Sequence, residues 1–125
     1  MGRSWYHWAH EPCWVVRKPR AKVPFLGSRD QATVWRVPSP KMIMGGSDEE
    51  KFDHPTQKPV ELMRRPILNH LKRGEMIYEP FLGSGTTLVA AERTGRVGRA
   101  IELEPKYVSV ILERLQEMGC EARAV

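Results

Sequence analysis

The stretch from Glu79 to Thr87 holds the residues best suited to bind a ligand. It reads Glu-Pro-Phe-Leu-Gly-Ser-Gly-Thr-Thr and lies between a predicted strand and a predicted helix. At such a junction backbone N–H groups point outward, and glycines let a ligand approach closely. A P-loop needs a Lys before the Ser/Thr, and a dinucleotide fingerprint needs a third glycine where Leu88 stands. The loop therefore favours neither a nucleoside triphosphate nor a dinucleotide.

Two carboxylates flank this loop. Glu79 ends the first predicted strand, and Glu102, 23 residues later, ends the second. A carboxylate at the tip of the second strand, about 20 residues beyond the glycine turn, is the usual acceptor for ribose hydroxyls. Leu103 beside it can cover an adenine face, and Glu79 favours a ligand with an amino group or a sulfonium. Either acid alone could be a solvated strand end, but the glycine turn between them favours a ligand site.

Three ordered motifs resemble the S-adenosylmethionine-binding half of the DNA amino-methyltransferases, which methylate adenine N6 or cytosine N4. They are His54–Pro59 (His-Pro-Thr-Gln-Lys-Pro), the loop from Glu79 to Thr87, and Ile101–Tyr107 (Ile-Glu-Leu-Glu-Pro-Lys-Tyr). Their order resembles the permuted class of phages and restriction-modification systems. The resemblance covers about residues 54–118, and more loosely the zone from Trp5 to Val37.

The resemblance implies S-adenosylmethionine as the cofactor and double-stranded DNA as the partner. It implies that Glu79, where the family usually has Asp, faces the methionine amino group, and that Glu102 holds the ribose hydroxyls. The glycine loop would form a backbone cradle, and the Thr-Gln-Lys segment would close over the methionine end. The cofactor-binding residues implied in this way are Thr56, Gln57, Lys58, Glu79, Phe81, Gly83, Ser84, Gly85, Thr86, Thr87, Glu102 and Leu103.

The catalytic motif of this family does not occur in the sequence. The family accepts protons from the target amine with an Asp/Asn/Ser-Pro-Pro-aromatic motif, but the chain has no Pro-Pro dipeptide, and Ser39-Pro40-Lys41 is the nearest approach. We therefore assign no catalytic residue here and expect the motif upstream or on a second subunit. The expected function is a DNA methyltransferase, adenine N6 ahead of cytosine N4, represented by its cofactor-binding portion. The alternative is a remnant or split subunit that binds cofactor or DNA without catalysis.

Helices and strands are expected to alternate from residue 54 onward. Apolar spacing predicts a helix from Val60 to Leu71 that is kinked or divided at Pro66. The other expected elements are a buried strand at 76–78, a helix from Thr86 to Gly95, a strand at 97–103 and a helix from Pro105 to Gly119. This order predicts parallel strands in an α/β, Rossmann-like S-adenosylmethionine-dependent methyltransferase fold. The fold is expected to be incomplete, because the catalytic half of the sheet is largely absent.

The N-terminal third differs from the rest in composition. Trp14–Val16 and Thr33–Val37 predict two strands joined by a long loop. Residues 1–53 are thus expected to hold a strand pair and basic loop from the end of the catalytic half plus a linker, and residues 54–125 the S-adenosylmethionine-binding half. The chain has a net charge of +5, and the surplus lies in residues 1–47. Its basic loop beside several aromatics could contact DNA phosphates or be merely solvated, and the tryptophans could stack on bases or pack a sheet. The candidate DNA-binding residues are Arg17, Lys18, Arg20 and Lys22.

Composition also limits the setting of the protein. With only two cysteines, Cys13 and Cys120, the 125 residues carry no disulfide framework, which favours a reducing cytoplasm. The DNA partner that the resemblance implies adds an expected association with the nucleoid. No apolar run approaches the roughly 18 residues of a membrane span. His7, His10 and Cys13 have ligand-like spacing, but a fourth ligand is lacking, so no metal is predicted. Exposed sheet edges predict a homo-oligomer or aggregation unless they are covered.

Overall fold

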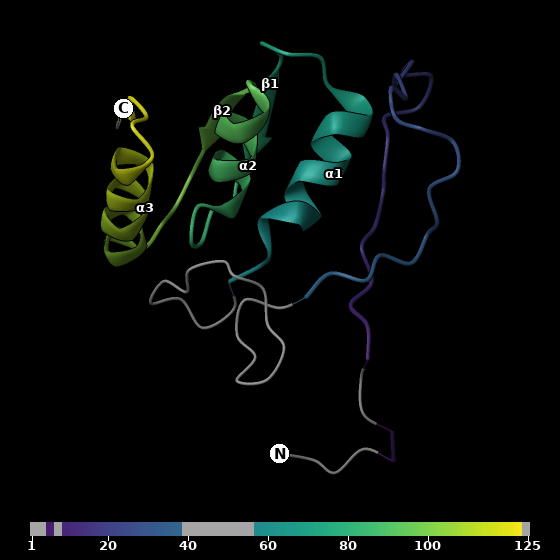
Figure 1. Ribbon diagram of the computed structural model, residues 1–125, viewed down its shortest axis with the longest axis horizontal. Helices are drawn as coiled ribbons and strands as arrows, with labels where there is room; N and C mark the ends of the chain where they lie inside the picture. The colour runs from purple at the N-terminus through teal and green to yellow at the C-terminus, as the bar shows by residue number, and fades with distance from the viewer. Residues whose placement is uncertain (1–4, 7–8, 39–56, 124–125) are drawn as a thin grey trace.

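The computed structural model describes residues 5–6, 9–38 and 57–123 (Figure 1). Its elements are α1 (Val60–His70), β1 (Met76–Glu79), α2 (Thr86–Thr94), β2 (Val97–Ala100) and α3 (Pro105–Glu117). Within these ranges β1 and β2 form one parallel pair, with Met76 opposite Val97 and Glu79 opposite Ala100. Figure 1 shows α1 and α3 on opposite sides of the β1–α2–β2 unit. The predicted alternation and parallel pairing are confirmed.

The helix ends follow the local signals in the sequence. Gly95 ends α2 in a left-handed conformation with φ of 68°, and its N–H bonds to the carbonyl oxygens of Ala91 and Glu92. α3 begins at Pro105, whose fixed φ suits a first helical position. α1 is a single helix across Pro66, so the division into two pieces is wrong. The second strand ends at Ala100, three residues earlier than predicted.

α2 lies at the centre of the hydrophobic core. Val89 and Ala90 are fully buried, and the core cluster also contains Val60 and Ile67 from α1 and Ile111 and Leu115 from α3. The three helices therefore share one core, in which α2 touches both neighbours. This arrangement fixes the start of α2 relative to the ends of the two strands.

The sheet is covered on one face. In β1 and in β2, half-buried residues alternate with exposed ones. Ile77 packs against the core, whereas Met76 and Tyr78 on the opposite face are 60% and 62% exposed. The prediction of a buried strand at 76–78 is therefore wrong for one face, because the described chain supplies no element to cover it.

The N-terminal segment lies along the side of α1 that faces away from the sheet (Figure 1). The Leu26 N–H donates to the Asn69 carbonyl oxygen at 2.7 Å, and the side-chain amides of Gln31 and Asn69 exchange two hydrogen bonds of 2.8 and 2.9 Å. The Arg65 guanidinium lies 4.9 Å from the centre of the Trp35 ring. Polar and stacking contacts thus attach residues 24–35 to α1.

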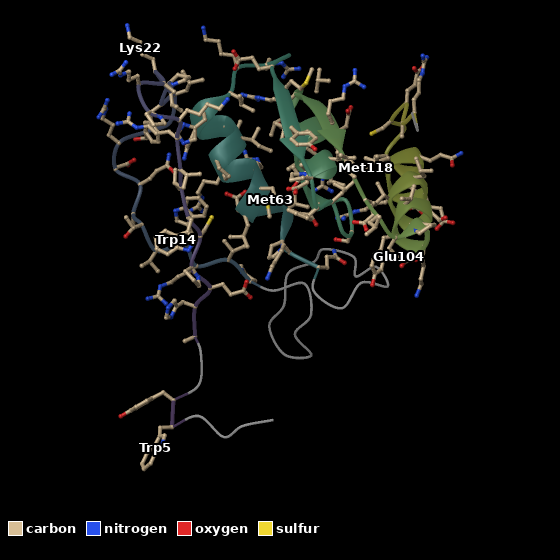
Figure 2. All side chains as sticks on the ribbon, turned by 180° about the vertical axis from the view of Figure 1, so that it is seen from behind. Trp5, Trp14, Lys22, Met63, Glu104 and Met118 are labelled. Carbon is tan, nitrogen blue, oxygen red and sulfur yellow. The ribbon has the colours of Figure 1, made fainter. Side chains whose placement is uncertain are left out.

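The two strands predicted at 14–16 and 33–37 are wrong. Both stretches are irregular, and Trp14, Val15 and Val16 are at least 85% exposed. A strand forms only where a neighbouring strand satisfies its backbone groups, and no described residue pairs with either stretch. Figure 2 shows Trp5 far from the helices and Trp14 on the outer segment, so neither of these tryptophans packs a sheet.

Arg96 joins the C-terminal ends of α1 and α2. Its guanidinium donates to the carbonyl oxygens of Leu71 and Thr94, at helix ends where partial negative charge accumulates. We expect Arg96→Met to lower the free energy of unfolding by about 1–3 kcal/mol, because these carbonyls lose a charged donor. Urea denaturation measures the change. Arg99→Met, which alters an exposed arginine of β2, is the control, and equal midpoints for the two variants would contradict the role of Arg96.

Candidate functional site

The predicted glycine loop and acidic residues meet at the carboxyl ends of β1 and β2. Residues 80–85 connect β1 to α2, and Glu102 follows the end of β2 by two positions. The Gly83 N–H donates to Glu102 Oε2 at 2.7 Å. This contact ties the glycine loop to the end of the second strand.

Glu79 is oriented by the loop that follows it. One carboxylate oxygen accepts the Phe81 N–H at 3.0 Å, and the other accepts the Thr87 hydroxyl at 3.1 Å. An ionised carboxylate can accept about four hydrogen bonds, so these contacts leave room for an ammonium group. The arrangement presents a fixed negative charge where β1 ends.

Two glycines give the loop its shape. Gly83 and Gly85 have φ of 57° and 80°, values that cost other residues about 1–2 kcal/mol. The Gly85 N–H closes a tight turn on the Leu82 carbonyl oxygen at 3.1 Å. α2 then begins at Thr86, and its first N–H groups have no partner within the helix, which favours a polar or anionic ligand group nearby.

The segment before α1 packs on the start of α2. The Thr86 hydroxyl donates to the Lys58 carbonyl oxygen at 3.2 Å, and the Ser84 and Thr86 hydroxyls lie 3.2 Å apart. Gln57 is 4% exposed. Gln57 and Lys58 are thus brought to the glycine loop, whereas Thr56 lies outside the described residues.

The Lys58 ammonium group pairs with a residue that the sequence motifs did not select. Its Nζ lies 2.5 Å from Glu11 Oε2, and the two side chains are 42% and 78% exposed. A surface ion pair of this kind contributes about 0–1 kcal/mol, so the lysine can exchange partners at little cost. Glu11 is 47 residues away in the chain, and no local signal marks it.

Large apolar and buried polar side chains surround the loop. Phe81 and Leu103 are 87% and 94% exposed, an unusual state for such residues beside two carboxylates. Ser84, Thr86, Thr87 and Arg114 are all buried. Sequence reasoning missed Arg114, although a charge three positions after Ile111, on the apolar stripe of the last helix, is a signal that could have found it.

The candidate DNA-binding residues lie away from this loop. Arg17, Lys18, Arg20 and Lys22 are exposed, and a turn between them is closed by the Ala21 N–H on the Lys18 carbonyl oxygen at 3.1 Å. The chain then reaches the C-terminal end of α1, where His70 Nδ1 lies 2.8 Å from the Pro24 carbonyl oxygen. The 11 residues of α1 span about 16 Å, so the basic turn and Lys58 are separated by roughly that length. Figure 2 likewise shows Lys22 and Glu104 at opposite ends of the molecule.

The described residues offer neither a metal site nor a membrane-spanning helix, and one cysteine has a perturbed thiol. No cluster of three or more His, Cys, Asp or Glu side chains within residues 5–6, 9–38 and 57–123 could hold a metal ion, and His7 lies outside these ranges. None of the helices there is long and apolar enough to cross a membrane. Burial, and then the charge of Glu92, raise the pKa of the Cys120 thiol, which keeps it protonated and unreactive at neutral pH.

A family model described as DNA methylase, N6_N4_Mtase, matches residues 7–113. The chain therefore belongs to this family of DNA methylases. Type II methyltransferase M2.DpnII of Streptococcus pneumoniae is 48% identical over 63 residues, which cover 50% of this chain and 24% of that protein. DNA adenine methyltransferase YhdJ of Escherichia coli (strain K12) is 35% identical over 92 residues, which cover 74% of this chain and 30% of that protein.

A solved structure agrees with the fold. The crystal structure of an M1.HpyAVI–SAM complex matches with a TM-score of 0.63 and 32% identity, covering 77% of this chain and 45% of that chain. The α/β, Rossmann-like methyltransferase fold is therefore confirmed, in an incomplete form. The chain spans about a quarter to a third of the two curated relatives.

Proposed function

We propose that this chain is the S-adenosylmethionine-binding portion of a site-specific DNA methyltransferase that methylates an exocyclic base amine, adenine N6 ahead of cytosine N4. The observation that carries the proposal is the hydrogen bond from the Gly83 N–H to Glu102. It joins a glycine loop and a carboxylate at the carboxyl ends of two parallel strands, where ligands bind in open α/β sheets. The family match and the relative named as a DNA adenine methyltransferase support it.

The residues at the site fit this cofactor. Glu79 would hold the methionine ammonium group and Glu102 the ribose hydroxyls, while the exposed Phe81 and Leu103 would cover the adenine ring. Lys58 would leave Glu11 for the methionine carboxylate. When bound, S-adenosylmethionine supplies an activated methyl group. The backbone of Gly83, Ser84 and Gly85, the hydroxyls of Thr86 and Thr87, and the side chains of Thr56 and Gln57 would complete the pocket.

Calorimetric titration of the full chain tests this proposal. We expect S-adenosylmethionine and S-adenosylhomocysteine to bind at one site, and ATP to bind far more weakly because the loop has no P-loop lysine. ATP serves as the control for nonspecific nucleotide binding. The absence of heat and of thermal stabilisation with both sulfur-containing ligands would contradict the proposal.

A specific observation also favours the split-subunit or remnant alternative. The exposed face of the sheet carries Met76, Tyr78 and Val97, which are 60%, 62% and 43% exposed. Such a surface is suited to a second subunit or another copy of the chain, and the Pro-Pro-aromatic motif would then come from the partner. Methyl transfer to unmethylated DNA by this chain alone would exclude the alternative. Methyl transfer only after mixing with a chain that carries the motif would support a split enzyme. Cofactor binding without methyl transfer, both alone and after mixing, would support a remnant.

We further propose that the basic turn, residues 17–22, contacts the phosphates of DNA. The DNA would be that of the nucleoid, in the cytoplasm. The length of α1, about 16 Å, separates the basic turn from Lys58, and this corresponds to about five base pairs of duplex at 3.4 Å each. We expect a variant with Arg17→Gln, Lys18→Gln, Arg20→Gln and Lys22→Gln to bind duplex DNA more weakly. The slope of the logarithm of the binding constant against the logarithm of the salt concentration is expected to become shallower by up to about four. Fluorescence anisotropy at several salt concentrations measures both. Cofactor binding is the control, and an unchanged salt slope would contradict phosphate contact.

A further inference from the structure

α3 supports the glycine loop from the side of the core. Ile111 lies so close to Gly85 that a Cβ at that position would come within 3.2 Å of two Ile111 carbons. One turn further along, Arg114 is 6% exposed. Its Nη1 atom donates a hydrogen bond to the Ser84 carbonyl oxygen at 2.8 Å. The same face of α3 thus contacts two consecutive residues of the loop.

A guanidinium group at this position is costly. Removing a charged group from water destabilises a protein unless polar partners compensate. Ile111 and Leu115, which flank Arg114 on the buried face of α3, are apolar members of the core. An apolar side chain at position 114 would extend this core without the penalty. The buried charge therefore indicates a polar contact that packing does not supply.

Opposite charges fix two consecutive residues of the loop. Glu102 accepts the Gly83 N–H at 2.7 Å, and Arg114 donates to the Ser84 carbonyl oxygen. The Gly85 N–H, in the same peptide unit as that carbonyl, bonds to Leu82. Because peptide units are planar, these contacts orient the peptides before Gly83 and after Ser84. The peptide between them, which carries the Ser84 N–H, is then constrained from both sides.

We propose that Arg114 is a positioning residue of the glycine loop. By holding the Ser84 carbonyl group toward α3, it orients the Gly83–Ser84 peptide so that the Ser84 N–H faces the bound cofactor. This role rests on the proposed binding of S-adenosylmethionine and concerns affinity for it. Arg114 acts through the loop backbone and touches no atom of the cofactor.

The test compares Arg114→Met and Arg114→Lys with Leu115→Ala in the full chain. Leu115→Ala removes a buried core side chain next to Arg114 and lowers stability, while it leaves the hydrogen bond from Arg114 to the Ser84 carbonyl oxygen in place. We expect affinity for S-adenosylmethionine to fall about tenfold in R114M and about threefold in R114K, because a charged hydrogen bond is lost or lengthened. L115A and R123M, which alters an 87% exposed arginine, are expected to bind like the wild type. All affinities are measured below the unfolding transition of each variant.

The possible outcomes separate this role from the proposed function. Failure of the wild-type chain to bind the cofactor contradicts the proposed function, whatever the variants do. If the wild type binds and R114M and R114K bind with unchanged affinity, the role of Arg114 is overturned. It is also overturned if L115A loses as much affinity as the Arg114 variants for the same loss of stability. If R114M does not fold, the test is the NMR spectrum of ligand-free R114K compared with that of the wild type. The amide resonances of Ser84 and Gly85 are expected to shift, while those of Thr94 and Gly95 are not. Unshifted resonances of Ser84 and Gly85 overturn the proposal.

Discussion

Glu102→Gln is expected to reduce the affinity of the chain for S-adenosylmethionine by about 100-fold. The substitution keeps the size of the side chain but removes the charged carboxylate that would accept hydrogen bonds from two ribose hydroxyls. Each charged hydrogen bond contributes about 1.5–3 kcal/mol, and 1.4 kcal/mol corresponds to a factor of ten. Because the Gly83 N–H also loses a charged acceptor, the glycine loop is weakened as well. Isothermal calorimetry measures the loss.

Glu104→Gln is the matched control for Glu102→Gln. Glu104 is exposed and makes no side-chain cap to α3, although its backbone N–H bonds to Glu102 Oε1 at 2.9 Å. The substitution therefore removes one negative charge from the same region and leaves the contacts of Glu102 intact. Equal affinities of the two variants would show that the net charge of the region, and not the Glu102 carboxylate, governs binding.

Gly85→Ala is expected to lower the free energy of unfolding by about 2–5 kcal/mol. The left-handed conformation at φ of 80° costs a residue with a Cβ about 1–2 kcal/mol. The new methyl group would also lie 3.2 Å from both Cγ1 and Cγ2 of Ile111, and such crowding of a packed core typically costs about 1–3 kcal/mol. Because Gly85 also ends the glycine loop, cofactor affinity is expected to fall at the same time. Urea denaturation and calorimetry measure the two effects.

Gly74→Ala separates the two contributions in Gly85→Ala. Gly74 has a similar φ of 79°, but a Cβ there would meet nothing within 4 Å. This control carries the backbone cost without the crowding of Ile111. An equal loss of stability in the two variants would contradict tight packing of α3 against the loop.

The elements from residue 60 onward could be predicted because their signals are local. Gly95 and Pro105 mark helix boundaries through their own backbone preferences, and the structure has them at those boundaries. The glycine loop and Glu102 lie together because parallel strands place their carboxyl ends at one edge of the sheet, and the Gly83 N–H bonds to Glu102 there. The binding roles of the individual residues stay predictions.

The N-terminal segment could not be predicted in the same way. Trp14–Val16 and Thr33–Val37 have the composition of strands, but strand formation depends on a partner, which composition does not reveal. The contacts that attach this segment to α1 join residues far apart in the chain, such as Gln31 and Asn69. For the same reason Glu11 beside Lys58 left no trace in the motifs. Arg114 did leave one, as a charge on an apolar stripe.

The central position of α2 also sets the order in which parts of the molecule open. Val89 and Ala90 are fully buried between α1, α3 and the sheet, so their amide hydrogens are exposed to exchange only when the whole core opens. Residues 9–38 are held mainly by polar contacts on the outer side of α1 and open at much lower cost. A protease that cleaves after Arg17 or Arg20 would therefore cut the chain within the basic turn first and spare the core around the glycine loop. The proposed contact with DNA and the proposed binding of the cofactor thus belong to parts of the chain with different local stabilities.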